Sequence, residues 1–372
     1  MLFADIVGHE AIKTKLRQSV TESRISHAQL FGGPESCGSL PMAIAYIQYI
    51  SCNNRTELDS CGHCESCKKI SKLSHPDIHF SLPVNLPGDS KVTSAAFVPE
   101  FRKLFLKNPY LSLNDWIEAI DVENKQVVIN THEAEQVIKT LGFKSFESEY
   151  KFLLLWLPEK MNDSAANKLL KSFEEPPEKT LIILVSHDPA SVLPTILSRT
   201  QLIRFHALSD EEVAQTLVQN FGIQSLLAQK IAPLCNGNVA LASKLASEMD
   251  EYALKQIQFR DWMSASRVKN ITKLMEEMEV FAKLGRESQK RYLEFSLKMV
   301  RASLVMSFEP SVAYVTEAEG AFLQKFKSVL TPDKIEPMFD LINQAISHIE
   351  RNANPKILFL DLSLQLSPHL QG

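Results

Sequence analysis

The chain has 372 residues, of which 45% are hydrophobic and 23% are charged, and its formal net charge at pH 7 is -4. This length is too great for one compact core and predicts two or three domains, while the weak negative charge excludes a protein whose overall field attracts nucleic acid. The sequence has no apolar run of about 18 residues and no basic segment followed by a long apolar stretch at its start, so we expect a cytoplasmic protein with neither membrane span nor signal peptide.

The first half of the chain predicts mixed helices and strands. HAQLFGG, residues 27–33, suits a buried strand, and PMAIAYIQYI, residues 41–50, predicts a helix with Pro41 in its first position. Residues 76–100 are rich in Pro, Gly, Ser and Asp and predict a loop. VPEFRKLFLKNPYLSLNDWIEAI, residues 98–120, favours a helix with a buried aromatic face.

Residues 127–206 alternate between helices and strands. THEAEQVIKTLGF predicts a helix with Thr131 as its N-cap, and NDSAANKLLKSF, residues 162–173, predicts another. KFLLLWL (151–157), TLIILVS (180–186) and QLIRF (201–205) predict strands. Strands that are apolar throughout and are separated by helices indicate a parallel sheet that is covered on both faces.

Helices are predicted from residue 207 onward. Ser209 and Glu212 form a capping box, and Asn354 followed by Pro355 predicts the start of a last helix over NPKILFLDLSLQL. We therefore expect an α/β domain over residues 1–206, a small helical lid over 207–254 and an all-α domain over 255–372.

Four of the six cysteines, Cys52, Cys61, Cys64 and Cys67, have the spacing C-x8-C-x2-C-x2-C. Close pairs of this kind let thiolates converge on one tetrahedral ion, and four thiolates leave no open position, so the spacing predicts a structural zinc site. A disulfide pair, an iron–sulfur cluster and unrelated buried thiols are the alternatives. The isolated Cys37 and Cys235 are expected to be buried thiols.

The loop GGPESCG resembles a phosphate-binding loop, G-x-x-x-x-G-K-[ST], without its functional side chains. Gly33 and Gly38 fit the pattern, but Ser39 replaces the lysine and Leu40 replaces the hydroxyl. The strand that should end in a magnesium-binding acid ends in Trp156 and Leu157, with Glu159 as the nearest acid. These losses in two distant segments predict that ATP does not bind productively, although the glycines alone could also form an ordinary turn.

Several motifs together resemble the bacterial DNA polymerase III clamp-loader family, and the delta-prime subunits within it most closely. They are NDSAANKLLKSFEEPP (162–177), SRT (198–200), SHAQLFGGPES (26–36) and the four-cysteine insertion. The resemblance implies an AAA+ P-loop-type domain with a lid and a helical collar. It also implies a hetero-pentamer with motor subunits and a delta subunit, which places a sliding clamp on primed DNA.

The resemblance assigns one functional side chain. Arg199 of SRT matches an arginine that reaches the ATP of the neighbouring subunit as an arginine finger, whereas the alternative is a surface arginine that pairs with a nearby acid. A second arginine of active relatives, in the lid helix, is replaced by Ala240 in NGNVAL. Glu174 and Glu175 lie at a helix C-terminus, where the helix dipole disfavours negative charge, so we expect a basic partner for them and no catalysis.

Three functions compete at this point. The first is a non-hydrolysing clamp-loader subunit that supplies Arg199 in trans, and the second is an ATP-binding motor subunit of the gamma/tau type. The third is a zinc-bearing DNA-binding module, which Lys68, Lys69 and Lys72 favour and the acids Glu57, Asp59 and Glu65 oppose. The empty loop together with SRT favours the first.

Overall fold

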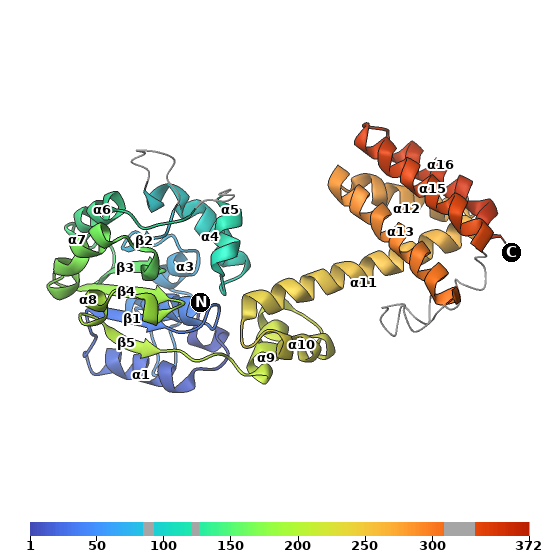
Figure 1. Cartoon of the computed structure of the whole chain (residues 1–372). Coiled ribbons are helices and arrows are strands. Elements are labelled where there is room, and N and C mark those ends of the chain that lie inside the picture. The colour runs from blue at the N-terminus through green and yellow to red at the C-terminus, as the bar shows by residue number, and fades with distance from the viewer. Residues whose placement is uncertain (85–92, 121–125, 309–331, 372) are drawn as a thin grey trace. The chain divides into compact units, whose positions relative to one another are not determined.

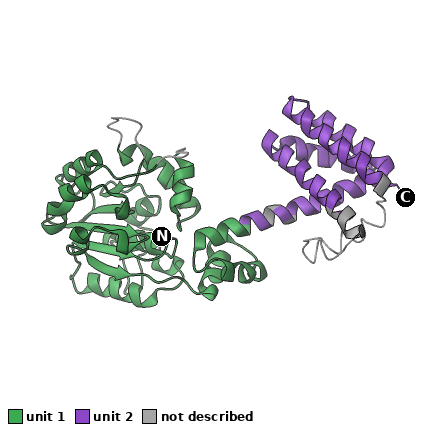
Figure 2. Ribbon diagram, viewed as in Figure 1, with its two compact units in different colours: residues 1–246 green, residues 247–372 purple. Residues whose placement is uncertain are grey.

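The structure, a computed structural model, describes residues 1–84, 93–120, 126–308 and 332–371. The chain divides into two compact units, Met1–Ala246 and Ser247–Gly372 (Figure 2). Within the described residues, no helix combines the length and the apolar character that crossing a membrane requires.

The first unit is built on a five-stranded parallel sheet in the order β2-β3-β4-β1-β5 (Figure 1). The strands are β1 (Ala28–Gly32), β2 (Ile78–Ser81), β3 (Lys151–Trp156), β4 (Thr180–Ser186) and β5 (Gln201–Arg204). Every residue of β1, β3 and β4 is buried. A parallel sheet with buried central strands needs helices on both faces, as the continuous apolar runs predicted.

Alternate residues of the central strands supply the two cores beside the sheet. Phe152, Leu154 and Trp156 of β3 pack with helix α2 (Ser39–Ser51), whereas Leu153 and Leu155 pack with α6 (Thr131–Leu141) and α7 (Asp163–Glu174). This α/β part also contains α1 (Glu10–Thr21), α3 (Glu65–Ser71), α8 (Pro194–Leu197) and the short η1 (Phe3–Asp5), η3 (Pro158–Lys160) and η4 (Pro189–Ser191).

Four local predictions differ from the structure, and two of them lie between residues 76 and 120. The segment predicted as a loop contains β2, η2 (Ser94–Phe97) and the start of α4 (Val98–Lys107). Its residues 85–92 lie outside the described part. The single helix predicted over 98–120 is two, α4 and α5 (Leu113–Ala119), because Asn108 precedes a proline and takes an extended conformation.

The other two differences concern helix starts. The N-cap of α6 is Asn130, whose side chain accepts from the N–H of Glu133, so Thr131 is instead the first helical residue. Helix α2 begins at Ser39, two residues before Pro41, because Gly38 takes a positive φ of 104° directly ahead of it.

Helices follow the sheet as predicted. The capping box of Ser209 and Glu212 opens α9 (Asp210–Phe221), and α10 (Ser225–Ile231), η5 (Ala232–Leu234) and α11 (Val239–Arg267) come next. Helix α11 continues past residue 254, so the predicted lid boundary falls inside one helix. The division into three domains therefore stays a prediction.

The second unit is helical in its described residues. It contains the end of α11 with α12 (Ile271–Lys283), α13 (Arg286–Phe308), α15 (Pro332–Glu350) and α16 (Pro355–Leu370), and residues 309–331 lie outside the description. Trp262 organises its core by stacking on Phe359 at 4.9 Å and donating from Nε1 to Ser363 Oγ at 2.7 Å. Asn354 caps α16, which confirms the predicted helix.

Candidate functional site

The glycine loop leaves the end of β1 and is held tightly by its neighbours. The N–H of Gly33 donates to the carbonyl of Ser186 at the end of β4, at 3.2 Å. A Cβ on Gly33 would lie 2.6 Å from Cβ and 2.7 Å from the carbonyl oxygen of Phe205. Gly38 has a φ of 104°, which few residues other than glycine adopt. The two glycines are thus explained by packing and backbone conformation.

The positions that should hold phosphate and magnesium are buried and uncharged. Ser39 and Leu40 lie in the first turn of α2 and are 2% and 3% exposed. Trp156 and Leu157, at the end of β3, are also buried. The nearest acid, Glu159, accepts hydrogen bonds from the backbone N–H groups of His187 at 2.9 Å and Asp188 at 3.4 Å. These side chains offer no cation for a phosphate.

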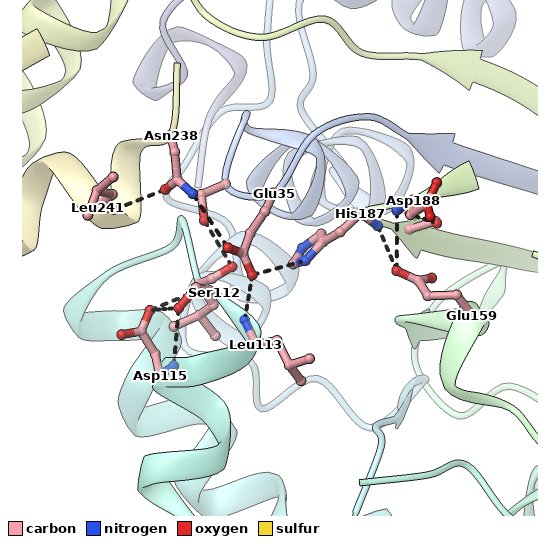
Figure 3. Close-up of polar contacts among 12 residues, drawn as sticks. Glu35, Ser112, Leu113, Asp115, Glu159, His187, Asp188, Asn238 and Leu241 are labelled. Atoms are coloured by element: carbon pink, nitrogen blue, oxygen red, sulfur yellow. Dashed lines mark hydrogen bonds and ion pairs between the residues drawn. The ribbon is translucent and has the colours of Figure 1, made fainter. Parts of the chain in front are cut away.

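Glu35 is the charged side chain of the loop, and its carboxylate joins three other segments (Figure 3). One oxygen accepts from the N–H of Leu113 at the start of α5, at 2.8 Å, and lies 3.5 Å from His187 Nδ1 after β4. The other oxygen accepts from the amide of Asn238, ahead of α11, at 3.4 Å. The hydrogen bond with His187 is the main reason why the pKa of Glu35 is lowered. An ionised carboxylate therefore occupies this loop at neutral pH.

The segment between α4 and α5 covers the loop from outside the sheet. Tyr110 is 1% exposed, and its Cε1 would lie 3.5 Å from a Cβ on Gly38. Ser36 Oγ donates to the carbonyl of Leu111 at 3.3 Å. This contact could not be predicted from the sequence, because the residues involved are about 75 positions apart and carry no shared motif.

His9 supports the same loop from the N-terminal side. Its Nε2 lies 2.7 Å from the carbonyl of Cys37, which can only accept, so Nε2 carries the proton. Burial lowers the pKa of His9 and raises the pKa of the buried Cys37 thiol to about 11. Cys37 and Cys235 are both buried free thiols, as predicted.

Arg199 lies at the opposite end of the strands from the glycine loop. It precedes β5, whose Gln201 pairs with Gln29 near the start of β1, whereas the glycine loop follows Gly32 at the end of that strand. The strand rise places at least about 10 Å between these two levels. Arg199 therefore cannot serve the loop of its own chain.

Arg199 has a partner on its own chain. Its Nε and Nη2 lie 2.6 Å and 2.5 Å from one carboxylate oxygen of Glu174, the last residue of α7. This is the basic partner that the unfavourable position of Glu174 predicted. Glu175, the next residue, has no ion pair within the described part of the chain. The role of Arg199 toward a neighbouring subunit stays a prediction.

The four clustered cysteines converge as their spacing predicted. Their sulfur atoms all lie within 4.8 Å of one another, and Cys61 Sγ is 4.0 Å from Cys67 Sγ. Four ligands about 2.3 Å from a tetrahedral zinc would lie about 3.8 Å apart, so the donor set fits zinc. All six cysteines are free thiols, and the N–H groups of Cys61 and Cys64 donate to sulfurs of the cluster, as suits bound thiolates.

The residues around this cluster bind other parts of the same chain. Asp59 accepts from the N–H groups of Phe3 at 3.2 Å and Ala4 at 2.9 Å, which ties the cysteine module to the start of the chain. Two of the nearby lysines are paired, Lys68 with Glu65 at 3.1 Å and Lys69 with Glu147 at 2.6 Å. These pairs reduce the positive charge that a DNA-binding surface would need.

Comparison with known proteins is consistent with this geometry. A family model described as DNA polymerase III, delta subunit, matches residues 8–209. The DNA polymerase III subunit delta' of Bacillus subtilis is 28% identical over 238 residues, which cover 64% of this chain and 59% of that protein. The subunit tau/gamma of Haemophilus influenzae is 25% identical over 242 residues, 64% of this chain and 29% of that protein.

A third relative, subunit tau of Bacillus subtilis, is 20% identical over 380 residues, 96% of this chain and 60% of that protein. The chain thus spans less than two thirds of the length of each of these relatives. With the parallel sheet and the helices after it, the matches confirm the predicted AAA+ fold. Since the matched residues exceed half of the chain and include the glycine loop, the cysteine cluster and Arg199, this chain belongs to the DNA polymerase III delta subunit family of clamp-loader proteins.

Proposed function

We propose that this chain is a non-hydrolysing, structural subunit of a DNA polymerase III clamp loader. In this role it joins ATP-binding motor subunits and a delta subunit in a hetero-pentamer that places a sliding clamp on primed DNA. The relatives named delta', tau and tau/gamma support the assembly. One observation carries the non-hydrolysing part, namely that the charged side chain of the glycine loop is the anion Glu35 and not a cation.

The electrostatics of the loop oppose nucleotide binding. Two like unit charges about 4 Å apart repel by roughly 4 kcal/mol in an effective dielectric constant of about 20. A triphosphate beside Glu35 would meet this repulsion without the lysine and magnesium that offset phosphate charge in active relatives. Tyr110 and Leu111 pack against the loop, and neither offers a cation to a phosphate. ATP is therefore not expected to bind this chain productively.

Arg199 gives such a subunit a catalytic contribution in trans. Its position at the opposite end of the strands from the glycine loop suits contact with another chain. A guanidinium brought to the γ-phosphate of a neighbour stabilises the charge of the transition state, an effect worth roughly 10³–10⁵ in rate in GTPases. The zinc held by Cys52, Cys61, Cys64 and Cys67 has a structural role in this proposal, because four thiolates leave no position for a substrate.

The second candidate is an ATP-binding motor subunit, and the matches to tau and gamma/tau proteins favour it. Titration of the purified chain with a fluorescent ATP analogue and magnesium separates the two. The proposed function predicts no saturable binding at high micromolar ligand, and clear magnesium-dependent binding would overturn it.

The trans contribution is tested in the reconstituted clamp loader. Arg199→Ala should lower the ATPase rate of the assembly by at least about 10-fold if the guanidinium acts on the transition state. Arg204→Ala is the matched control, since Arg204 is exposed at the far end of β5, the strand that Arg199 precedes. Equal rates for both variants would remove the arginine finger from the proposal.

A further inference from the structure

The guanidinium of Arg199 is already bound within its own chain. Nε and Nη2 both contact Oε1 of Glu174, at 2.6 Å and 2.5 Å. Nη1 donates to the carbonyl of Thr195 at 2.9 Å and lies 3.2 Å from Ser198 Oγ. All three nitrogens are therefore occupied by groups of α7, α8 and the residue that follows α8.

We infer that Glu174 holds Arg199 in a docked position and competes for it with the γ-phosphate bound by the neighbouring subunit. The inference rests on the proposed trans role of Arg199 and adds its regulation. Glu174 is thus a positioning residue for Arg199 and has no catalytic role of its own.

The donor geometry of the guanidinium requires this competition. Arginine has five N–H groups in a planar fork and binds carboxylates and phosphates through pairs of parallel donors. Nε and Nη2 form one such pair, and Glu174 binds both of them. In the other pair, Nη1 and Nη2, the Nη1 atom already contacts the carbonyl of Thr195 and Ser198 Oγ. A phosphate can receive two donors only after one of these contacts breaks.

The ion pair between Arg199 and Glu174 is weak enough for another anion to replace Glu174. Glu174 ends α7, where the helix dipole disfavours a carboxylate. The Arg199 and Glu174 side chains are 30% and 48% exposed, so water screens the pair. Pairs of this exposure typically stabilise by up to about 1 kcal/mol, which corresponds to roughly fivefold in an equilibrium. A γ-phosphate carries more negative charge than a carboxylate, so it can displace Glu174 at little cost.

The expected consequence is a restrained ATPase. While the neighbouring site is empty or misaligned, Arg199 stays on Glu174. When the subunits close on a bound nucleotide, the guanidinium exchanges one oxyanion for another. Removing the carboxylate should release Arg199 and raise the ATPase rate of the loader in the absence of clamp and DNA by up to about fivefold.

The test uses the reconstituted clamp loader and four variants of this chain. Glu174→Gln keeps the size of the side chain and removes its charge, and should raise the rate without clamp and DNA. Glu175→Gln, the adjacent glutamate that has no ion pair in the described structure, should leave the rate unchanged. Arg199→Ala should lower the rate, and Arg199→Ala combined with Glu174→Gln should match Arg199→Ala alone, because Glu174 acts through Arg199.

The outcomes separate the inference from the proposed function. If Arg199→Ala lowers the rate but Glu174→Gln lowers it too or leaves it unchanged, the inference is wrong and the arginine finger stands. If Arg199→Ala has no effect, both are wrong.

Proton exchange at Arg199 Nε, followed by NMR in the isolated chain, gives a readout without partners. Exchange should be faster in Glu174→Gln than in the parent chain or in Glu175→Gln. Equal exchange in all three would show that Glu174 does not hold the guanidinium, and would also overturn the inference.

Discussion

The carboxylate of Glu35 accepts a 2.8 Å hydrogen bond from the backbone N–H of Leu113. This contact connects the glycine loop to helix α5 across 78 residues of sequence. In a phosphate-binding loop the bound phosphates would be the anions that organise the surrounding segments. Here the loop carries an anion of its own, and Figure 3 shows that it reaches the segments after β4 and before α11 as well.

Glu35→Ala should therefore destabilise the first unit. The change leaves the N–H of Leu113 without its charged acceptor, and hydrogen bonds to charged groups contribute about 1.5–3 kcal/mol. With Glu35 about one-third exposed, we expect a loss near the lower end, about 1–2 kcal/mol in the free energy of unfolding by urea. Glu178→Ala is the control, because Glu178 is exposed and its side chain makes no hydrogen bond or ion pair in the described structure. A loss below about 0.5 kcal/mol in the free energy of unfolding would mean that the hydrogen bond between Glu35 and Leu113 does not stabilise the first unit.

The sequence predicted the parts of the fold that rest on local pattern. Strands β3 and β4 followed from runs of buried apolar residues, and the start of α9 followed from Ser209 and Glu212. Strand β2 was missed because its four residues, IHFS, alternate for only two repeats and fall in a segment rich in Pro, Gly, Ser and Asp. An edge strand of this kind forms because β3 offers it hydrogen-bond partners, which only the tertiary structure supplies.

The same distinction holds for the site. The losses at Ser39 and Leu40 and the cysteine convergence could be predicted because each depends on residue type at fixed spacing. The roles of Glu35 and Tyr110 could not, because each contact joins segments that are distant in sequence and have no motif in common. A phosphate-binding motif without its functional side chains therefore predicts which side chains the loop lacks. It does not predict which contacts the loop makes in their place.

Acid should destabilise the first unit before its carboxylates titrate. Burial is the main cause that lowers the pKa of His9, His75 and His79 from 6.5. The unfolded state therefore binds more protons than the folded state below pH 6.5, and stability falls as the pH falls through that value. Each histidine contributes a slope of up to about 1.4 kcal/mol per pH unit, which urea unfolding between about pH 7.5 and 5.5 measures.

His75→Asn should reduce the dependence of the unfolding free energy on pH by the contribution of one histidine. Nδ1 of His75 accepts from the N–H of Asp77 at 3.2 Å, and an asparagine oxygen can accept in its place without titrating. His348→Asn, an exposed position in the second unit, is the control and should leave the slope of the first unit unchanged. An unaltered slope in His75→Asn would show that His75 is not among the groups responsible.

The cysteine cluster should contain one zinc ion per chain and stabilise the start of the first unit. Cys64→Ser should lose the metal, because three thiolates cannot complete the tetrahedral set. Chelation should lower the midpoint of thermal unfolding, since the contacts of Asp59 with Phe3 and Ala4 depend on a folded module. Metal analysis of Cys235→Ser, a buried cysteine outside the cluster, provides the control. Iron with visible absorbance in place of zinc would instead favour the iron–sulfur alternative.

Gly33→Ala should be destabilising although the loop binds no nucleotide. The new methyl group would lie 2.6 Å from Phe205 Cβ and 2.7 Å from its carbonyl oxygen, so the loop or the end of β5 must shift. Overpacking of this kind costs about 1–3 kcal/mol in the free energy of unfolding, which denaturant titration measures. Gly285→Ala is the matched control, because a Cβ there meets no atom within 4 Å and its φ is not positive. That change should alter stability by no more than about 0.5 kcal/mol. If Gly33→Ala were as neutral as Gly285→Ala, the loop would be free to move away from Phe205, and packing would no longer explain why glycine stands at this position.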